Sequence, residues 1–143
     1  VDLRILAPPE LSPPPDLIKE LMSDAAVGAR ILATREPREA LEGCEAVYND
    51  VWVSMGEEHL VAERVAMLRG FKVTPRLMAL TGRPDSIYLH CLPAHRDDST
   101  EFARAHPEVC EVSDEVFESP QSRVFDQAEN RMHTAKAVMV LTL

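Results

Sequence analysis

Strand-like and helix-like patterns of hydrophobic residues alternate along the chain. Runs rich in β-branched and aliphatic residues predict short strands at 1–7, 29–34, 45–49 and 86–91. Apolar residues three and four positions apart predict helices at 16–22, 36–41, 57–69, 76–80, 113–117 and 122–143. The stretch 97–111 is polar and irregular, so no element is predicted there. Because strands and helices alternate, we expect a parallel sheet joined by right-handed crossovers.

Residues that start or stop helices define these boundaries further. Thr74 and Ser113 stand where a side-chain oxygen can cap the first turn of a helix. Gly70 and Gly82 follow helical stretches and are expected to end them. The proline-rich segment 8–15 predicts a stiff loop before the first helix, because proline does not continue a strand or a helix interior.

The composition fits one globular domain. The chain has 143 residues, of which 45% are hydrophobic and 27% charged, and these are ordinary values for a folded domain. No apolar run approaches the ~18 residues that a membrane-spanning helix needs. The first residues carry neither an initiator Met nor a signal-peptide pattern. We therefore expect a trimmed or partial chain.

Charge and cysteine content exclude several kinds of partner. The net charge is −9, from 15 Lys and Arg against 24 Asp and Glu, which argues against nucleic acid and against an anionic membrane surface. Cys44, Cys91 and Cys110 form no CxxC pair, so neither a disulfide framework nor a zinc ribbon is indicated. A reducing, cytoplasmic setting fits best.

The first segment with candidate chemistry follows the predicted strand 45–49. The sequence lacks the GxGxxG and GxxxxGK[ST] loops of nucleotide-binding proteins. In parallel α/β sheets, ligands bind beyond the carboxyl ends of strands. There, Asp50 supplies a carboxylate, Ser54 a hydroxyl and Gly56 a close backbone approach before the next helix. The alternative is that Asp50 and Ser54 only cap that helix.

The second segment, 90–96, begins at the end of the predicted strand 86–91 and contains His90 and Cys91. A metal site is one interpretation, although adjacent strand residues point to opposite faces of a sheet. A nucleophilic cysteine is a second interpretation, although no Cys/His/Asn set is evident from the spacing. An ordinary buried cysteine is the third.

The third segment lies on the predicted C-terminal helix. Gln127, Asn130, Arg131 and Thr134 are spaced to form one polar stripe. A solvated helix face is one explanation. Arg131 also opens an apolar half-helix, so we expect it to be held against the body of the domain, where its planar fork suits an oxyanion.

These three segments together carry a family resemblance. Asp-Val-Trp-Val-Ser-Met-Gly at 50–56, His-Cys-Leu-Pro at 90–93 and Phe-Asp-Gln-Ala-Glu-Asn-Arg-Met-His-Thr at 125–134 resemble ornithine carbamoyltransferase, in that order. The likeness extends to 78–82 and 115–119 and covers nearly the whole chain. It implies an aspartate/ornithine carbamoyltransferase-like fold: a three-layer Rossmann-like parallel sheet with flanking helices, here 1–143 as the ornithine-binding half, truncated at its N-terminus.

The resemblance also implies a reaction and the residues that bind the amino acid. The family transfers the carbamoyl group of carbamoyl phosphate to the δ-amine of L-ornithine, giving citrulline and phosphate. Asp50 is expected to bind the α-amino group of ornithine. Ser54 and the backbone of Met55 are expected to hold the same end of the substrate, and Cys91 is expected to lie near the δ-amine.

Two further positions are expected to contact the carbamoyl donor. The resemblance implies that the backbone carbonyl of Leu92, before a cis bond to Pro93, contacts the carbamoyl group. Arg131 is expected to bind carbamoyl phosphate and to stabilise charge on the carbonyl oxygen. This chemistry needs no metal or redox cofactor. Asp50 and Cys91 are both polar groups that can share the δ-amine proton, and the sequence leaves open which one does.

The chain also departs from the family pattern. It lacks the Ser-x-Arg-Thr-Arg phosphate loop, the His-Pro-x-Gln segment, and the strand–loop–helix that opens the ornithine domain and supplies an Asn. We therefore expect no activity from the chain alone. Family members are commonly trimers, so a trimer-based homo-oligomer is expected for the full enzyme. Carbamoyl transfer to another amine such as putrescine, or a non-catalytic binding domain of the same fold, are the alternatives.

Overall fold

A computed structural model describes residues 1–23 and 28–143 of the chain. Parallel strands and helices alternate, as the hydrophobic pattern predicts. The strands are β1 (Asp2–Leu6), β2 (Arg30–Thr34), β3 (Ala46–Asn49) and β4 (Ile87–His90). The helices are α1 (Pro15–Ser23), α2 (Pro37–Leu41), α3 (Val61–Leu68), α4 (Pro75–Met78), α5 (Glu101–Ala105), α6 (Asp114–Phe117) and α7 (Val124–Thr142).

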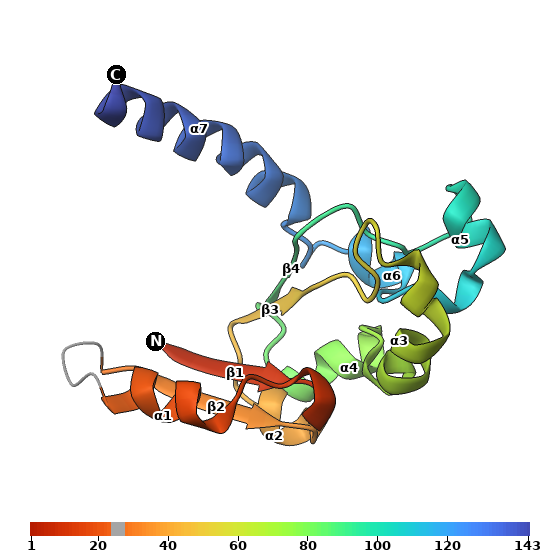
Figure 1. Cartoon of the computed structure of the whole chain (residues 1–143), viewed down its shortest axis with the longest axis horizontal. Helices are drawn as coiled ribbons and strands as arrows, with labels where there is room; N and C mark the ends of the chain where they lie inside the picture. Colours follow the sequence, from red (N-terminus) through yellow and green to blue (C-terminus); the bar gives the residue numbers. More distant parts are fainter. Residues whose placement is uncertain (24–27) are drawn as a thin grey trace.

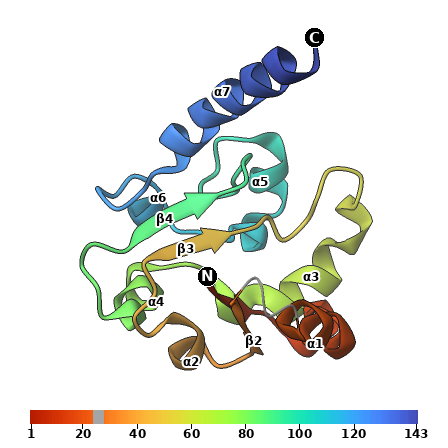
Figure 2. The ribbon, with the colours of Figure 1, turned by 90° about the vertical axis from the view of Figure 1, so that its left-hand side faces the viewer.

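The strands form two parallel pairs, and this corrects the expectation of one continuous sheet among the described residues. β1 pairs with β2, and β3 pairs with β4 with Asn49 opposite His90. A cavity of about 640 Å³ is lined by both β1 and β3. Among the described residues, no ladder of backbone hydrogen bonds joins β1 to β3. Figure 2 shows β3 and β4 side by side, with their carboxyl ends at the same edge.

Two hydrophobic clusters support the β3–β4 pair. The larger one is built on Tyr88, which is fully buried, and joins α2, α4, α6 and the first turn of α7. The smaller one contains Trp52, Val53, Val61 and Val109. Trp52 and Val53 belong to the segment that follows β3. The second cluster therefore anchors a loop that would otherwise be free to move at the end of that strand.

The structure confirms some of the predicted helix boundaries and corrects others. Thr74 caps α4 by accepting the backbone N–H of Leu77 at 3.3 Å, and Gly82 ends the following turn with φ +66°, as predicted. Gly70 does not end α3 in a left-handed turn. A 3₁₀ turn, Arg69–Phe71, instead continues the helix. Ser113 precedes α6 but makes no side-chain cap, because its Oγ is buried without a partner.

Helix α5 is the clearest correction to the sequence prediction, because the pattern predicts no element within 97–111. Thr100 caps this helix by accepting the backbone N–H of Ala103 at 3.0 Å. The ring of Phe102 lies between His95 and His106, with centroid distances of 5.1 Å to each. One cap and one aromatic contact thus hold a short helix that has almost no hydrophobic periodicity.

Helix α7 leaves the rest of the molecule at a steep angle. Figure 1 shows its C-terminal turns projecting away from the strands and from the other helices. Val124 is its only buried residue among those described, and every residue from Ala128 to the C-terminus is exposed. Several of these exposed residues are large and apolar: Val138, Met139, Val140, Leu141 and Leu143.

Candidate functional site

The carboxyl ends of β3 and β4 bring two predicted site residues into contact. Because Asn49 lies opposite His90 in the parallel register, the next residues, Asp50 and Cys91, also lie side by side. The thiol of Cys91 donates a hydrogen bond to Asp50 Oδ1 at 3.0 Å. The contact joins residues 41 positions apart in the chain. It is the clearest confirmation that the first two motifs share one location.

The Asp50 carboxylate does not cap the next helix. Its Oδ1 accepts the backbone N–H of Val51 at 2.9 Å, whereas the helical segment begins only at Glu58. The interpretation of Asp50 as a simple helix cap is therefore wrong. Asp50 is exposed, so its second carboxylate oxygen can receive a cation from outside.

The Cys91 thiol is held in its protonated form. Burial first, and then the hydrogen bond to Asp50, raise the pKa of Cys91 to about 11. A thiolate is the nucleophilic form of cysteine, and very little thiolate exists near neutral pH at such a pKa. This argues against the interpretation of Cys91 as a covalent nucleophile.

A buried pair behind Cys91 is absent from the sequence predictions. His90 Nε2 lies 3.1 Å from Glu111 Oε1, and both side chains are fully buried. His90 Nδ1 accepts the backbone N–H of Leu92 at 2.9 Å, which places the ring proton on Nε2, facing Glu111. Glu111 Oε1 also accepts the backbone N–H of His95 at 2.7 Å. The pair therefore fixes both ends of the 91–95 loop.

The same loop contains the cis bond that the resemblance implies. The Leu92–Pro93 peptide is cis, and Leu92 has φ +52°. A left-handed conformation is unfavourable for a residue with a branched side chain. The hydrogen bond from the Leu92 N–H to His90 holds this conformation in place.

A small cavity adjoins the loops that follow β3 and β4. It has a volume of about 350 Å³. Among the predicted site residues, Ser54, Met55 and Leu92 line it, together with the neighbouring apolar residues Val51, Val53, Pro93 and Phe102. Ser54 also lines the larger cavity that Asp50 borders. The structure thus groups five of the six predicted positions around adjoining loops.

Arg131 is the sixth position, and it lies apart from the others. It is exposed on the projecting part of α7 (Figure 1). Within the part of the chain that the structure describes, its side chain makes no hydrogen bond or ion pair to the body of the domain. The expectation that Arg131 packs against the body is therefore wrong, because α7 departs from the body before it reaches this residue.

Among residues 1–23 and 28–143, no three His, Cys, Asp or Glu side chains are grouped in a way that could hold a metal ion. His90 Nε2 carries the proton that faces Glu111, and Nδ1 accepts the Leu92 N–H, so neither ring nitrogen has a free lone pair for a metal ion. None of the described helices is both long and apolar enough to cross a membrane.

Comparison with known proteins places this architecture in one class. A parallel α/β domain with its polar site at adjacent strand ends is the general form of a substrate-binding domain. Residues 1–142 match the family profile of the aspartate/ornithine carbamoyltransferase Asp/Orn binding domain. The chain therefore belongs to that family.

Its similar relatives are ornithine carbamoyltransferases. The chain is 47% identical, over 143 residues, to ornithine carbamoyltransferase 2, phaseolotoxin-insensitive, of Pseudomonas syringae pv. actinidiae. It has the same identity to the anabolic ornithine carbamoyltransferase 2 of Pseudomonas savastanoi pv. phaseolicola. Each match covers 99% of this chain but 44% of the relative. The chain thus spans less than half the length of these curated relatives.

Solved structures of ornithine carbamoyltransferases are also similar to this chain. The ornithine carbamoyltransferase of Pyrococcus furiosus superposes with a TM-score of 0.80 at 37% identity, over 99% of this chain and 41% of that one. The anabolic enzyme of Campylobacter jejuni gives 0.79 at 31% identity, over 98% and 42%. The predicted fold class, an aspartate/ornithine carbamoyltransferase-like α/β domain, is confirmed.

Proposed function

We propose that this chain is the L-ornithine-binding part of an ornithine carbamoyltransferase. In this proposal the enzyme moves the carbamoyl group of carbamoyl phosphate to the δ-amine of L-ornithine and releases L-citrulline and phosphate. The observation that carries the proposal is the contact between Asp50 and Cys91, at the strand ends beside the cavity lined by Ser54, Met55 and Leu92. Relatives named for this activity, at 47% identity, support it.

The proposed binding mode uses the exposed carboxylate and the cavity together. Asp50 receives the α-ammonium group of ornithine, for which an exposed carboxylate is a suitable partner. Ser54 and Met55, on the same loop, hold the amino-acid end. The aliphatic chain then leads the δ-amine towards Cys91.

The δ-amine must lose a proton before it can attack. A primary amine of this kind has a pKa near ~10.4, so its deprotonation at pH 7 costs about 4–5 kcal/mol. A partly buried, protonated thiol removes water from the amine and carries no negative charge of its own, and the nearby Asp50 carboxylate is paired with the α-ammonium group in this proposal. Cys91 therefore orients and desolvates the amine in this proposal, and the thiol does not act as a base.

Carbamoyl transfer then follows as an acyl substitution. The amine nitrogen forms a bond to the carbonyl carbon, the bond from that carbon to the phosphate oxygen breaks, and the departing phosphate takes the proton that the nitrogen loses. Negative charge develops on the carbonyl oxygen, and Arg131 is the guanidinium proposed to stabilise it. The Leu92 carbonyl is proposed to accept a hydrogen bond from the carbamoyl NH₂. The products are citrulline, phosphate and one proton.

A chimeric enzyme tests this function. Residues 1–143 replace the matching segment of the Pseudomonas syringae relative, so that the relative supplies the remainder of its length. We expect citrulline formation from carbamoyl phosphate and L-ornithine, and none from the 143-residue chain alone. The unmodified relative serves as the assay control.

A panel of amines separates the proposed substrate from its alternatives. The chimera is assayed with L-ornithine, N-acetyl-L-ornithine and putrescine. We expect L-ornithine to be preferred by about a hundredfold in kcat/KM, because only it presents a free α-ammonium group together with a carboxylate. A preference for putrescine contradicts the ornithine assignment. A folded chimera that makes no product with any amine favours a non-catalytic binding domain.

The proposal also includes a cellular compartment and an oligomeric state. All three cysteines are free thiols, which fits a reducing compartment such as the cytoplasm. A trimer-based homo-oligomer stays a prediction from the family resemblance.

A further inference from the structure

The unusual feature of α7 is how little holds it to the rest of the molecule. After Val124, which is buried, the helix is exposed at every residue except Gln127. Gln127 is therefore the last residue of α7 that the body partly covers. Arg131 lies four residues further on, about one helical turn, so it shares a face with Gln127.

The outer edge of β4 explains the contact that Gln127 makes. Along this strand, alternate residues direct their backbone groups towards β3 and towards the outer edge. Tyr88 belongs to the outer set: its N–H donates to the Gln121 carbonyl at 2.9 Å, and its carbonyl accepts the Arg123 N–H at 2.9 Å. The segment before α7 thus runs along β4 as a short parallel neighbour.

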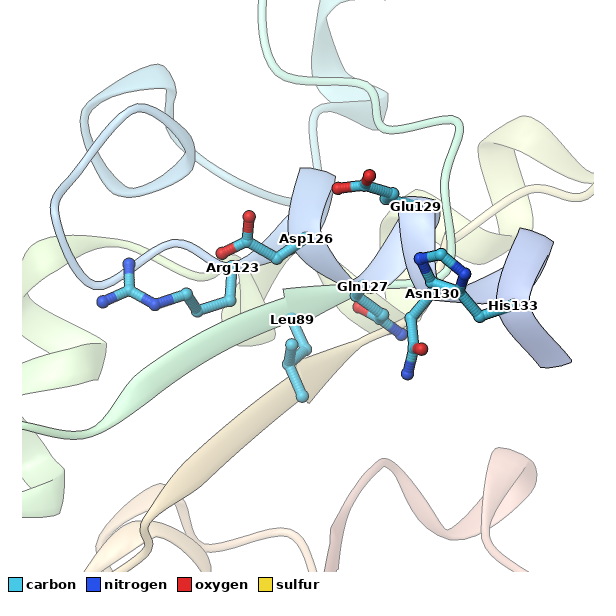
Figure 3. Close-up of a pocket in the computed structure, with 7 residues that line it drawn as sticks. All are labelled: Leu89, Arg123, Asp126, Gln127, Glu129, Asn130 and His133. Carbon is cyan, nitrogen blue, oxygen red and sulfur yellow. The ribbon is translucent and has the colours of Figure 1, made fainter.

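His90 is the next residue of this outer set, and its N–H needs a partner at the same edge. The chain has by then turned into α7 and offers no backbone carbonyl. Gln127 supplies the acceptor: its Oε1 lies 3.2 Å from the His90 nitrogen. Because His90 is 1% exposed, water does not readily replace this bond. Figure 3 shows Gln127 between the helix and β4, whereas Asp126 and Glu129 point away from Leu89.

This one hydrogen bond connects the two parts of the proposed site. His90 immediately precedes Cys91, and its ring holds the Leu92 N–H at 2.9 Å. Gln127 therefore joins the strand end that carries Cys91 and Leu92 to the helix turn that carries Arg131. A small rotation of α7 about its first turn would otherwise displace Arg131, since nothing beyond Gln127 restrains it within the described residues.

We propose that Gln127 is a positioning residue, which sets the place of Arg131 relative to Cys91 and Leu92 by holding the His90 N–H. This inference rests on the proposed function of Arg131. It requires an acceptor oxygen at position 127 and does not require the amide NH₂. Glutamate can therefore replace glutamine here, and an apolar side chain of the same length cannot.

The chimera described above supplies the kinetic test. Gln127→Met keeps the length and helix propensity of the side chain but removes the acceptor. We expect the KM for carbamoyl phosphate to rise about tenfold or more, since small displacements of a catalytic group have large effects. The KM for L-ornithine should change less than twofold. Gln127→Glu should restore the KM for carbamoyl phosphate, and Glu129→Gln, which leaves the bond to His90 in place, should leave both constants unchanged.

A measurement of hydrogen exchange keeps the test independent of catalysis. In the 143-residue chain, Gln127→Met should speed exchange of the His90 amide at least about tenfold, while the Tyr88 amide keeps its protection. An unchanged rate at His90 overturns the inference. A chimera whose kinetic constants do not change on Gln127→Met also overturns it, and leaves the proposed function intact. A chimera that makes no citrulline with Gln127 in place contradicts the proposed function itself.

Discussion

The ends of β3 and β4 and the helix α7 contribute to the same proposed site in opposite ways. At the strand ends, Asp50 and Cys91 contact each other directly, and a fully buried His90–Glu111 pair lies behind them. Along α7, the proposed Arg131 stands in an exposed stretch of helix. One part of the site is fixed by its own contacts, and the other is placed by the direction of a helix and by the single hydrogen bond between Gln127 and His90.

Because of this difference, mutations in the two regions should affect the stability of the fold and the reaction to different extents. The strand-end residues belong to a packed network, so changing the buried ones should destabilise the fold as well as the site. Arg131 contributes nothing to the packing, so changing it should affect the reaction alone. The amino-acid end of the substrate is therefore expected to depend on residues that the domain organises by itself. The carbamoyl phosphate end is expected to depend on α7.

The largest expected effect comes from Arg131→Ala in the chimera. Removing the guanidinium takes away the group proposed to stabilise the developing oxyanion, so kcat/KM for carbamoyl phosphate should fall about a thousandfold. Steady-state assays measure this. Arg131→Lys should recover only part of the loss, because an ammonium group lacks the planar fork. An Arg131→Ala chimera with ordinary kinetics contradicts the assignment.

The next effect concerns the other end of the substrate. Asp50→Asn should raise the KM for L-ornithine about a hundredfold, because the α-ammonium loses its carboxylate partner. The KM for carbamoyl phosphate should stay within twofold. N-acetyl-L-ornithine is the matched control, because it has no α-ammonium group to lose. If Asp50→Asn weakens both amines equally, Asp50 does not bind the α-amino group.

A third prediction compares the two regions by stability. Glu111→Leu leaves His90 Nε2–H and the His95 N–H without an acceptor, and it should lower the free energy of unfolding by about 3 kcal/mol. Glu111→Gln keeps an acceptor oxygen and should cost about 1 kcal/mol. Urea unfolding of the 143-residue chain measures both. Arg131→Ala should stay within about 0.5 kcal/mol of the parent. Equal losses for Glu111→Leu and Arg131→Ala would contradict the comparison.

Much of the fold follows from the hydrophobic pattern because the local spacing of apolar residues indicates where most of the elements lie. The four strands and the long α7 show such patterns. Helix α5 does not, because its stability comes from the Thr100 cap and from Phe102 packed between two histidine rings. The split between the two strand pairs is also invisible in the pattern, since it depends on which strand edges meet.

The candidate site likewise contains residues that can be placed from the sequence and residues that cannot. Asp50 and Cys91 can be placed together because Asp50 directly follows, and Cys91 ends, a strand that the pattern predicts. Glu111 cannot, because it lies in a polar stretch where a carboxylate is ordinarily exposed. Its burial depends on His90, which is 21 positions earlier. Gln127 is visible only as part of a polar stripe, and the backbone N–H that it accepts has no sequence signal.

The smallest effect is a chemical one at Cys91. A raised thiol pKa means that the folded protein binds the proton more tightly than an unfolded chain, so the reactive thiolate appears only at high pH. Iodoacetamide labelling of Cys91, followed by mass spectrometry, should rise with pH towards a midpoint of about 11. Asp50→Asn should move this midpoint down, because the Asp50 contact contributes to the raised pKa. A midpoint at or below 9.0, the ordinary value for this thiol, contradicts the assigned environment.

The most direct test of the account is whether L-ornithine protects Cys91 in the chimera. Labelling is carried out at alkaline pH with carbamoyl phosphate present and increasing L-ornithine, and Cys44, which lies before the first residue of β3, is the reference in the same digest. We expect Cys91 labelling to fall, with half-protection near the KM for L-ornithine, while Cys44 labelling stays constant. Undiminished Cys91 labelling at saturating L-ornithine would show that the amino acid does not bind at the strand ends.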